Sequence, residues 1–188
     1  MALLLDNTRD QTLLCFLDLQ KSDNVSCYDV RKVVNGASPQ EMGKSKFRFL
    51  SVLGNSFIVS DYGLNAVYVL KLSLKGELLK ETEIVGGLLK KPAGVSADHE
   101  GNILVADYED NKLCVFSDAG KKIRTIEVCV NCHLKNSYKF LVKVTPRGWM
   151  GEDRGKPSTV HLDPDTMELY VLCHRGQEGL VKLVPKLG

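Results

Sequence analysis

Long hydrophobic segments are missing from this chain of 188 residues. No apolar run approaches the roughly 20 residues that a membrane-spanning helix needs, so no membrane contact is expected. Residues 2–5 are apolar, but Asp6 and Arg9 follow at once and interrupt the continuous apolar core that a signal peptide requires. These two absences predict a cytoplasmic protein.

Motifs for catalysis and for nucleotide binding are also missing. The sequence has no Walker-type glycine-rich loop and no kinase signature. None of the four histidines has a nucleophile motif around it, and no grouping of Ser, His and Asp stands out. We therefore expect a protein that is not an enzyme, with no catalytic residue and no cofactor.

The six cysteines do not suggest a disulfide framework. Cys15, Cys27 and Cys114 are scattered through expected strands, where each suits the place of a small apolar residue. Thiols in a cytoplasmic protein stay reduced. We therefore expect buried, reduced thiols at these positions.

A second group of cysteines forms the string Cys129-Val130-Asn131-Cys132-His133, which has the spacing of covalent haem attachment. Haem attachment would require export, for which the sequence shows no signal. Zinc is another alternative, with Cys173 or His174 as the fourth ligand, but that pair lacks a second C-x-x-C spacing. We favour a loop with ordinary thiols at Cys129, Cys132 and His133, so no metal is expected.

Positive charge is concentrated in the C-terminal part of the chain. The formal net charge is +2, yet residues 1–120 hold 13 Lys and Arg against 16 Asp and Glu, and residues 121–188 hold 12 against 7. A mildly basic segment is a weak indication of an anionic partner.

The segment from Lys91 to Ile126 has the clearest structural pattern. Four short β-rich runs alternate with three turns, and each turn contains Gly, Asp or Asn. This alternation predicts a four-stranded antiparallel meander, the unit called a propeller blade. One such sheet cannot bury both of its faces alone, so the pattern also predicts neighbouring sheets of the same kind.

Related copies of this segment occur elsewhere in the chain. Residues 57–62 align with residues 103–108, and the aspartates Asp18, Asp61 and Asp107 are spaced by 43 and 46 residues. Propeller blades have periods of roughly 40–50 residues. We therefore predict an all-β propeller of about four blades, forming an incomplete or low-blade-number ring.

The predicted boundaries follow from the copies. Residues 1–188 are expected to form a single domain with blades at 1–35, 45–85, 91–128 and 156–186 and an insertion at 133–155. A ring that does not close would leave open edges through which two copies could associate.

The third copy resembles an NHL repeat. The resemblance runs through residues 92–95, Asp98, residues 101–107 and Asn111. It implies a β-propeller, commonly six-bladed, of the kind found in tripartite-motif ubiquitin ligases. In that family the propeller is a platform for proteins or RNA and shares no catalytic residue. No RING, B-box or coiled-coil region precedes the repeats, so no ligase activity is expected in this chain.

The insertion contains basic residues interleaved with aromatic ones. Lys139, Lys143, Arg147 and Trp149 are candidate contacts to single-stranded RNA, because cations neutralise phosphates and aromatic rings stack on unpaired bases. The alternative is a solvated loop whose aromatic side chains pack on the propeller. Residues 138–144 also alternate in a way that suggests an extra strand.

The aspartates that follow the predicted strands have two interpretations. Asp18, Asp61 and Asp107 can each accept backbone N–H bonds within their own turn, or aspartates can bind calcium, as in propeller lactonases. Recurrence of the same residue in each turn favours the first. We therefore predict a non-catalytic binding platform, with proteins as the first partner and single-stranded RNA as the second. The alternative is a calcium-dependent lactonase or esterase.

Overall fold

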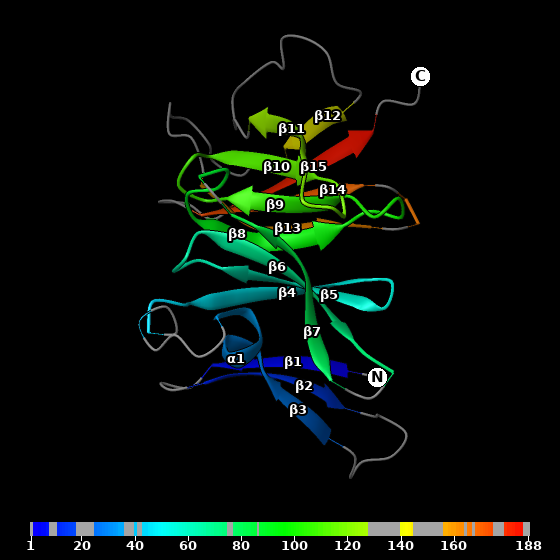
Figure 1. Cartoon of the computed structure of the whole chain (residues 1–188). Coiled ribbons are helices and arrows are strands. Elements are labelled where there is room, and N and C mark those ends of the chain that lie inside the picture. Colours follow the sequence, from blue (N-terminus) through cyan, green and yellow to red (C-terminus); the bar gives the residue numbers. More distant parts are fainter. Residues whose placement is uncertain are drawn as a thin grey trace.

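The computed structural model describes residues 2–7, 11–17, 25–35, 40, 43–74, 77–85, 87–127, 140–144, 156–163, 165–166, 168–174 and 179–185. Within these residues the chain forms fifteen β-strands and one short helix, arranged in four antiparallel sheets. Figure 1 shows the sheets following one another through the molecule, with the N-terminal sheet at one end.

The first sheet has three strands in the order β1-β2-β3 and is followed by the helix α1. Their bounds are β1 (Ala2–Asn7), β2 (Thr12–Leu17), β3 (Val25–Asp29) and α1 (Val30–Asn35). The helix is an addition to the predicted all-strand pattern. Val30 and Val34 are one helical turn apart and are both buried, so packing against the sheets stabilises this single turn and a half.

The second and third sheets are complete four-stranded meanders. The second consists of β4 (Phe47–Leu53), β5 (Ser56–Asp61), β6 (Ala66–Leu72) and β7 (Leu78–Ile84). The third consists of β8 (Pro92–Ala97), β9 (Ile103–Asp107), β10 (Lys112–Phe116) and β11 (Lys122–Glu127). The turns between the middle strands match in detail, because Asn65 and Asn111 both adopt positive φ angles, of 57° and 54°.

The fourth sheet takes one strand from the insertion. It has the order β12-β15-β14-β13, with β12 (Phe140–Val144), β13 (Lys156–Leu162), β14 (Leu169–His174) and β15 (Gly179–Pro185). Strand β12 precedes the other three in sequence but pairs with β15 at the outer edge, from Phe140↔Pro185 to Val144↔Val181. The strand expected within residues 138–144 is therefore confirmed.

Three apolar cores lie between the four described sheets. Leu14 of the first sheet packs with Phe57 and Val59 of the second. On the other face of the second sheet, Ile58 and Val69 pack with Phe116 of the third. The cores require strands that are apolar on both faces, and β5 and β9 are buried along almost their whole length.

The fourth sheet packs against the other face of the third sheet. Leu104 and Leu113 pack there with Val160, Leu162 and Val171. Inner strands lie beside one another from sheet to sheet, since β4 contacts β8 and β8 contacts β13. This stacking of three- and four-stranded antiparallel sheets confirms the predicted all-β, propeller-type fold.

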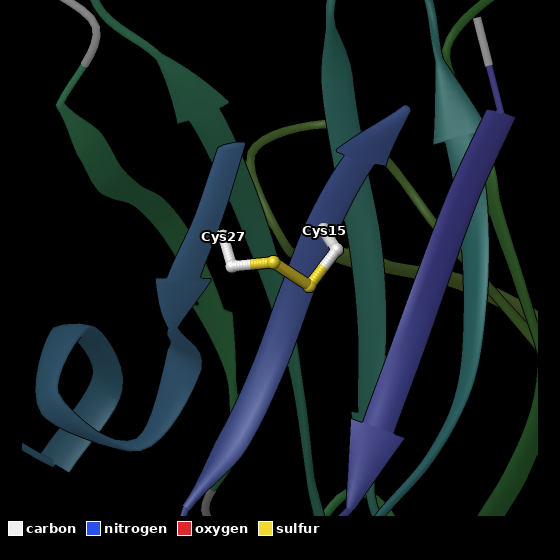
Figure 2. The surroundings of a disulfide bond; sticks show 2 residues. All are labelled: Cys15 and Cys27. Atoms are coloured by element: carbon white, nitrogen blue, oxygen red, sulfur yellow. A yellow bond between two sulfur atoms is a disulfide. The ribbon is translucent and has the colours of Figure 1, made fainter. Parts of the chain in front are cut away.

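The expectation of reduced thiols throughout is wrong for two cysteines. Cys15 and Cys27 are direct partners in the register of β2 and β3, and their sulfurs form a disulfide (Figure 2). The sequence placed both residues in strands but could not show that they face each other across one pair of strands. Cys114 is a buried free thiol, as expected.

Within the described part of the chain, no helix has the length and apolar character needed to cross a membrane.

Candidate functional site

One end of the sheets gathers most of the polar side chains that recur from sheet to sheet. In each antiparallel meander the end of the second strand lies beside the start of the first, as Asp61 does beside Phe47 and Asp107 beside Pro92. We call this end the turn face. It is formed by residues 44–48, 61–65, 89–92, 107–111 and 156.

Asp61 is fully buried at the turn face and organises its own turn. Its Oδ1 accepts N–H bonds from Gly63 at 2.9 Å and from Leu64 at 3.1 Å. The same oxygen accepts a third bond from the amide of Lys46, at 2.8 Å, which ties the turn to the start of β4. The predicted backbone-binding role of this aspartate is confirmed.

Asp107 occupies the equivalent position in the third sheet but uses different donors. Its Oδ1 accepts from the amide of Lys91 at 2.9 Å, and its Oδ2 accepts from the amide of Lys90 at 3.0 Å. The expected bonds within its own turn, residues 108–111, are not the ones formed. Both oxygens instead secure the approach to β8, because that backbone passes directly beside the end of β9.

Asp163 lies at the opposite end of its sheet, after β13. Its Oδ1 accepts from the amides of Asp165 at 2.9 Å and Thr166 at 3.1 Å, and these bonds, above all the one from Thr166, lower the pKa of the carboxyl group. Asp61, Asp107 and Asp163 therefore bind three separate stretches of backbone.

A tyrosine follows each of the two turn-face aspartates. The amide of Tyr62 donates to the carbonyl of Lys46, and the amide of Tyr108 donates to the carbonyl of Lys91, both at 2.9 Å. These matched bonds place the two rings in corresponding positions, with their centroids 6.4 Å apart.

Each tyrosine ring is covered by a lysine from the next sheet. The Nζ of Lys91 lies 4.9 Å from the centroid of Tyr62, and the Nζ of Lys156 lies 4.8 Å from that of Tyr108. Arg48 adds a second cation to Tyr62, with its Cζ 4.7 Å from the ring centroid. Cations over aromatic faces are attracted by the ring quadrupole.

Carboxylates neutralise part of this positive charge. Lys156 pairs with Glu109 at 3.4 Å, and Lys90 pairs with Asp110 at 2.6 Å. The hydrogen bond between Lys90 and Asp110 raises the pKa of the lysine and lowers that of the aspartate. Within the described residues, Arg48 and Lys91 have no such ion pair.

The described part of the chain does not fit a calcium site. None of its His, Cys, Asp and Glu side chains form a group of three that could hold a metal ion. Calcium needs six to eight converging oxygens, whereas Oδ1 of Asp61 and both carboxylate oxygens of Asp107 accept bonds from backbone amides, and the buried Oδ2 of Asp61 is a single oxygen.

A shallow depression at the other end of the second and third sheets is a weaker candidate. It is lined by Ser56, Glu81, Thr82 and Asp118, among others. Its polar groups already bind one another, since Ser56 donates to Glu81 at 2.8 Å and Thr82 to the carbonyl of Asp118 at 3.0 Å. The turn face therefore remains the better candidate site.

The sequence directed attention to a different segment. Lys139, Arg147 and Trp149, and also Cys129, Cys132 and His133, lie outside the described residues. Lys143 lies in β12, of which only the backbone is described. The RNA contacts proposed for these residues stay predictions.

The sequence also carried a signal for the turn face that was not used. Lys91 and Lys156 both precede a proline that begins or lies near the start of an inner strand, and Tyr62 and Tyr108 both follow an aspartate. Both short pairs recur in successive copies, but only the fold brings a lysine of one copy onto a tyrosine of the preceding copy.

Comparison with known proteins identifies the fold. No family model matches the sequence, and no curated protein matches it. Among solved structures, the chain is similar to a gluconolactonase from Xanthomonas campestris, with a TM-score of 0.60 and 12% identity over 96% of this chain and 46% of that chain.

Two further structures agree with the first. A luciferin-regenerating enzyme gives a TM-score of 0.55 and 15% identity, covering 95% of this chain and 52% of that chain. Regucalcin from Agrobacterium tumefaciens, a calcium-binding protein, gives 0.53 and 11%, covering 94% and 57%. The chain has a β-propeller fold and spans about half the length of these three proteins.

These similarities correct the functional expectation. The prediction of a non-catalytic binding platform, and of a protein that is not an enzyme, is wrong. The similar propellers include named enzymes, which favours the alternative of an enzyme over the platform. The recurring turns that suggested a platform define the meander and are equally compatible with an enzyme, since fold alone does not specify function.

Proposed function

We propose that the chain forms part of a propeller enzyme that hydrolyses a small lactone or ester. The observation that supports this proposal is the similarity to the gluconolactonase over 96% of the chain. The argument is one of fold analogy, so the chemistry must be sought in this chain's own residues.

Lactone hydrolysis places specific demands on a site. The oxygen of water bonds to the carbonyl carbon, the carbonyl oxygen becomes an oxyanion, and the ring C–O bond then breaks as the leaving oxygen takes a proton. The product is a hydroxy acid, which releases a proton to become a carboxylate. Fixed cations and N–H donors lower the energy of the oxyanion and bind the carboxylate.

The turn face offers such groups. Arg48 and Lys91 are cationic donors, and both contact the ring of Tyr62. Neither pairs with a carboxylate of the described residues. In this proposal they bind an anionic group of the substrate and so orient it for the attack of water. Because the described residues do not fit calcium, no step is assigned to a metal ion.

The finer resemblance to NHL repeats is also a proposal. It is supported by the motif at residues 92–107 and by the equivalent Asn65 and Asn111 turns, and it concerns the origin of the repeats. It carries no activity of its own.

The hydrolase proposal is tested by an assay of the purified full chain with glucono-1,5-lactone and with an aryl ester. Acid release is followed with a pH indicator and compared with buffer and with heat-denatured chain. We expect a rate above the spontaneous one with at least one of the two substrates. A rate equal to that in buffer with both substrates would refute the proposal.

A further inference from the structure

The Tyr62 cluster, which consists of Arg48, Tyr62 and Lys91, differs from its counterpart in the next sheet in one respect. There the Tyr108 cluster consists of Tyr108, Glu109 and Lys156, and Glu109 pairs with the lysine. The residue equivalent to Glu109 beside Tyr62 is Gly63. The lysine over Tyr62 therefore has no carboxylate from its own turn.

The backbone prevents any side chain from filling this place. A Cβ at Gly63 would collide with the carbonyl oxygen of Lys44 and would meet the amide nitrogen of Lys46 at 2.9 Å. The close passage arises because Asp61 holds Lys46 against the turn. The fold thus excludes a carboxylate side chain at position 63, beside Tyr62.

The second sheet also adds a cation that the other sheets lack. Arg48 follows the first residue of β4, and its equivalents after the starts of β8 and β13 are Ala93 and Ser158. Positive charge is therefore increased at the one cluster where the compensating carboxylate is missing.

Two cations against one ring repel each other unless an anion lies near them. The distances to the centroid of Tyr62, 4.7 Å and 4.9 Å, put the two charges at most about 10 Å apart, within the screening length of dilute salt. Ring attraction offsets only part of this repulsion. An external anion would relieve it.

We propose that the Tyr62 cluster is a binding site for the phosphate group of a phosphorylated sugar. Two uncompensated cations match the charge of about −1.5 to −2 of a phosphate monoester better than the single charge of a carboxylate. The Arg48 guanidinium supplies paired N–H donors, and Lys91 supplies a point charge.

This inference adds a ligand to the proposed function. It rests on that function only in calling the ligand a substrate. A phosphorylated sugar lactone would be held by its phosphate at the Tyr62 cluster. Binding itself does not depend on hydrolysis and is measured separately.

The test is titration of the full chain with glucose 6-phosphate, followed by calorimetry and by amide chemical shifts at Gly63 and Lys91, with glucose as the uncharged control. We expect glucose 6-phosphate to bind and glucose not to. R48A, which installs the alanine found at the equivalent position of β8, and K91Q should each weaken binding roughly tenfold.

K156Q is the matched control, because it removes the equivalent lysine where Glu109 already compensates the charge. It should change the affinity less than twofold. Circular dichroism checks that each variant is folded, which is expected for changes at surface side chains.

Three results would overturn the proposal: no measurable binding of glucose 6-phosphate, equal loss in K156Q and K91Q, or binding of a single-stranded RNA oligonucleotide without binding of glucose 6-phosphate. Binding of glucose 6-phosphate by a chain that hydrolyses no lactone would refute the hydrolase and leave the phosphate site standing.

Discussion

The carboxylate of Asp107 accepts a hydrogen bond of 2.9 Å from the backbone amide of Lys91, and so joins the end of β9 to the approach of β8. A second bond, from the amide of Lys90 to the other carboxylate oxygen, completes the link. Asp107 is only 1% exposed, so these bonds form away from competing water. The turn face depends on this link, because it fixes the residue that covers Tyr62.

We predict that D107A lowers the free energy of unfolding by about 2–4 kcal/mol, since two backbone donors lose a charged acceptor. D107N should cost less, because the amide oxygen can still accept one bond. Urea unfolding followed by circular dichroism measures both.

The control for Asp107 is D163A. Asp163 also binds two amides, but it does so in a solvent-exposed turn, so we expect D163A to lose clearly less stability than D107A. Equal losses in D107A and D163A would contradict the role given to the buried link.

Gly94 lies where the inner strands β8 and β13 pass closest. A Cβ there would come within 2.6 Å of Thr159 Cα and of the amide nitrogen of Val160, both of them backbone atoms. G94A should therefore separate the third and fourth sheets and cost more than about 2 kcal/mol in unfolding free energy.

G87A is a useful comparison for Gly94. Gly87 has a φ of 78° but nothing within 4 Å of its added Cβ, so only the backbone conformation is penalised, at about 1 kcal/mol. If G94A were no more destabilising than G87A in the same urea titration, the close packing of the inner strands would be refuted.

The disulfide between Cys15 and Cys27 closes a loop of 12 residues in sequence separation. Loop-entropy arguments give about 3 kcal/mol of stabilisation for a bridge of this size. Reduction should thus lower the unfolding temperature of the wild-type chain, and peptide mass spectrometry without reduction should recover the two cysteines linked.

A variant with serine at both positions, C15S together with C27S, separates the bridge from general effects of the reductant. Its unfolding temperature should equal that of the reduced wild type and should not respond to dithiothreitol. A further fall on adding dithiothreitol would show that another bridge is responsible.

Burial raises the pKa of the Cys114 thiol above its ordinary value of 9.0. Since the folded state holds the proton more tightly than the unfolded state, the contribution of this thiol is fully present below pH 9 and declines as the pH rises through the folded pKa. The wild type should lose stability relative to C114A as the pH rises above 9.

The readout for Cys114 is the difference in urea midpoint between the two proteins at each pH, which cancels the titration of lysines and tyrosines common to both. A difference that does not change with pH would contradict the buried, neutral state of this thiol.

The recurrence of short apolar runs and turn residues was enough to predict the meanders. Strands such as β5 and β9 are apolar on both faces, and only strands packed between two sheets need that composition. The same local pattern accounted for the bonds of Asp61 to Gly63 and Leu64, because they span two and three residues.

Contacts between the strands of one sheet could not be predicted in this way. The bonds from Lys90 and Lys91 to Asp107, the pairing of β12 with β15, and the Cys15–Cys27 bridge each depend on which backbones lie side by side. Sequence periodicity describes one strand at a time and does not fix register across strands.

For this protein, the sequence by itself determined that the chain folds as stacked antiparallel sheets, because local turn chemistry and two-sided apolar strands leave few other arrangements. The tertiary structure alone decided where charge accumulates, because the two cations at Tyr62 come from different sheets and the missing carboxylate is excluded by a passing backbone carbonyl.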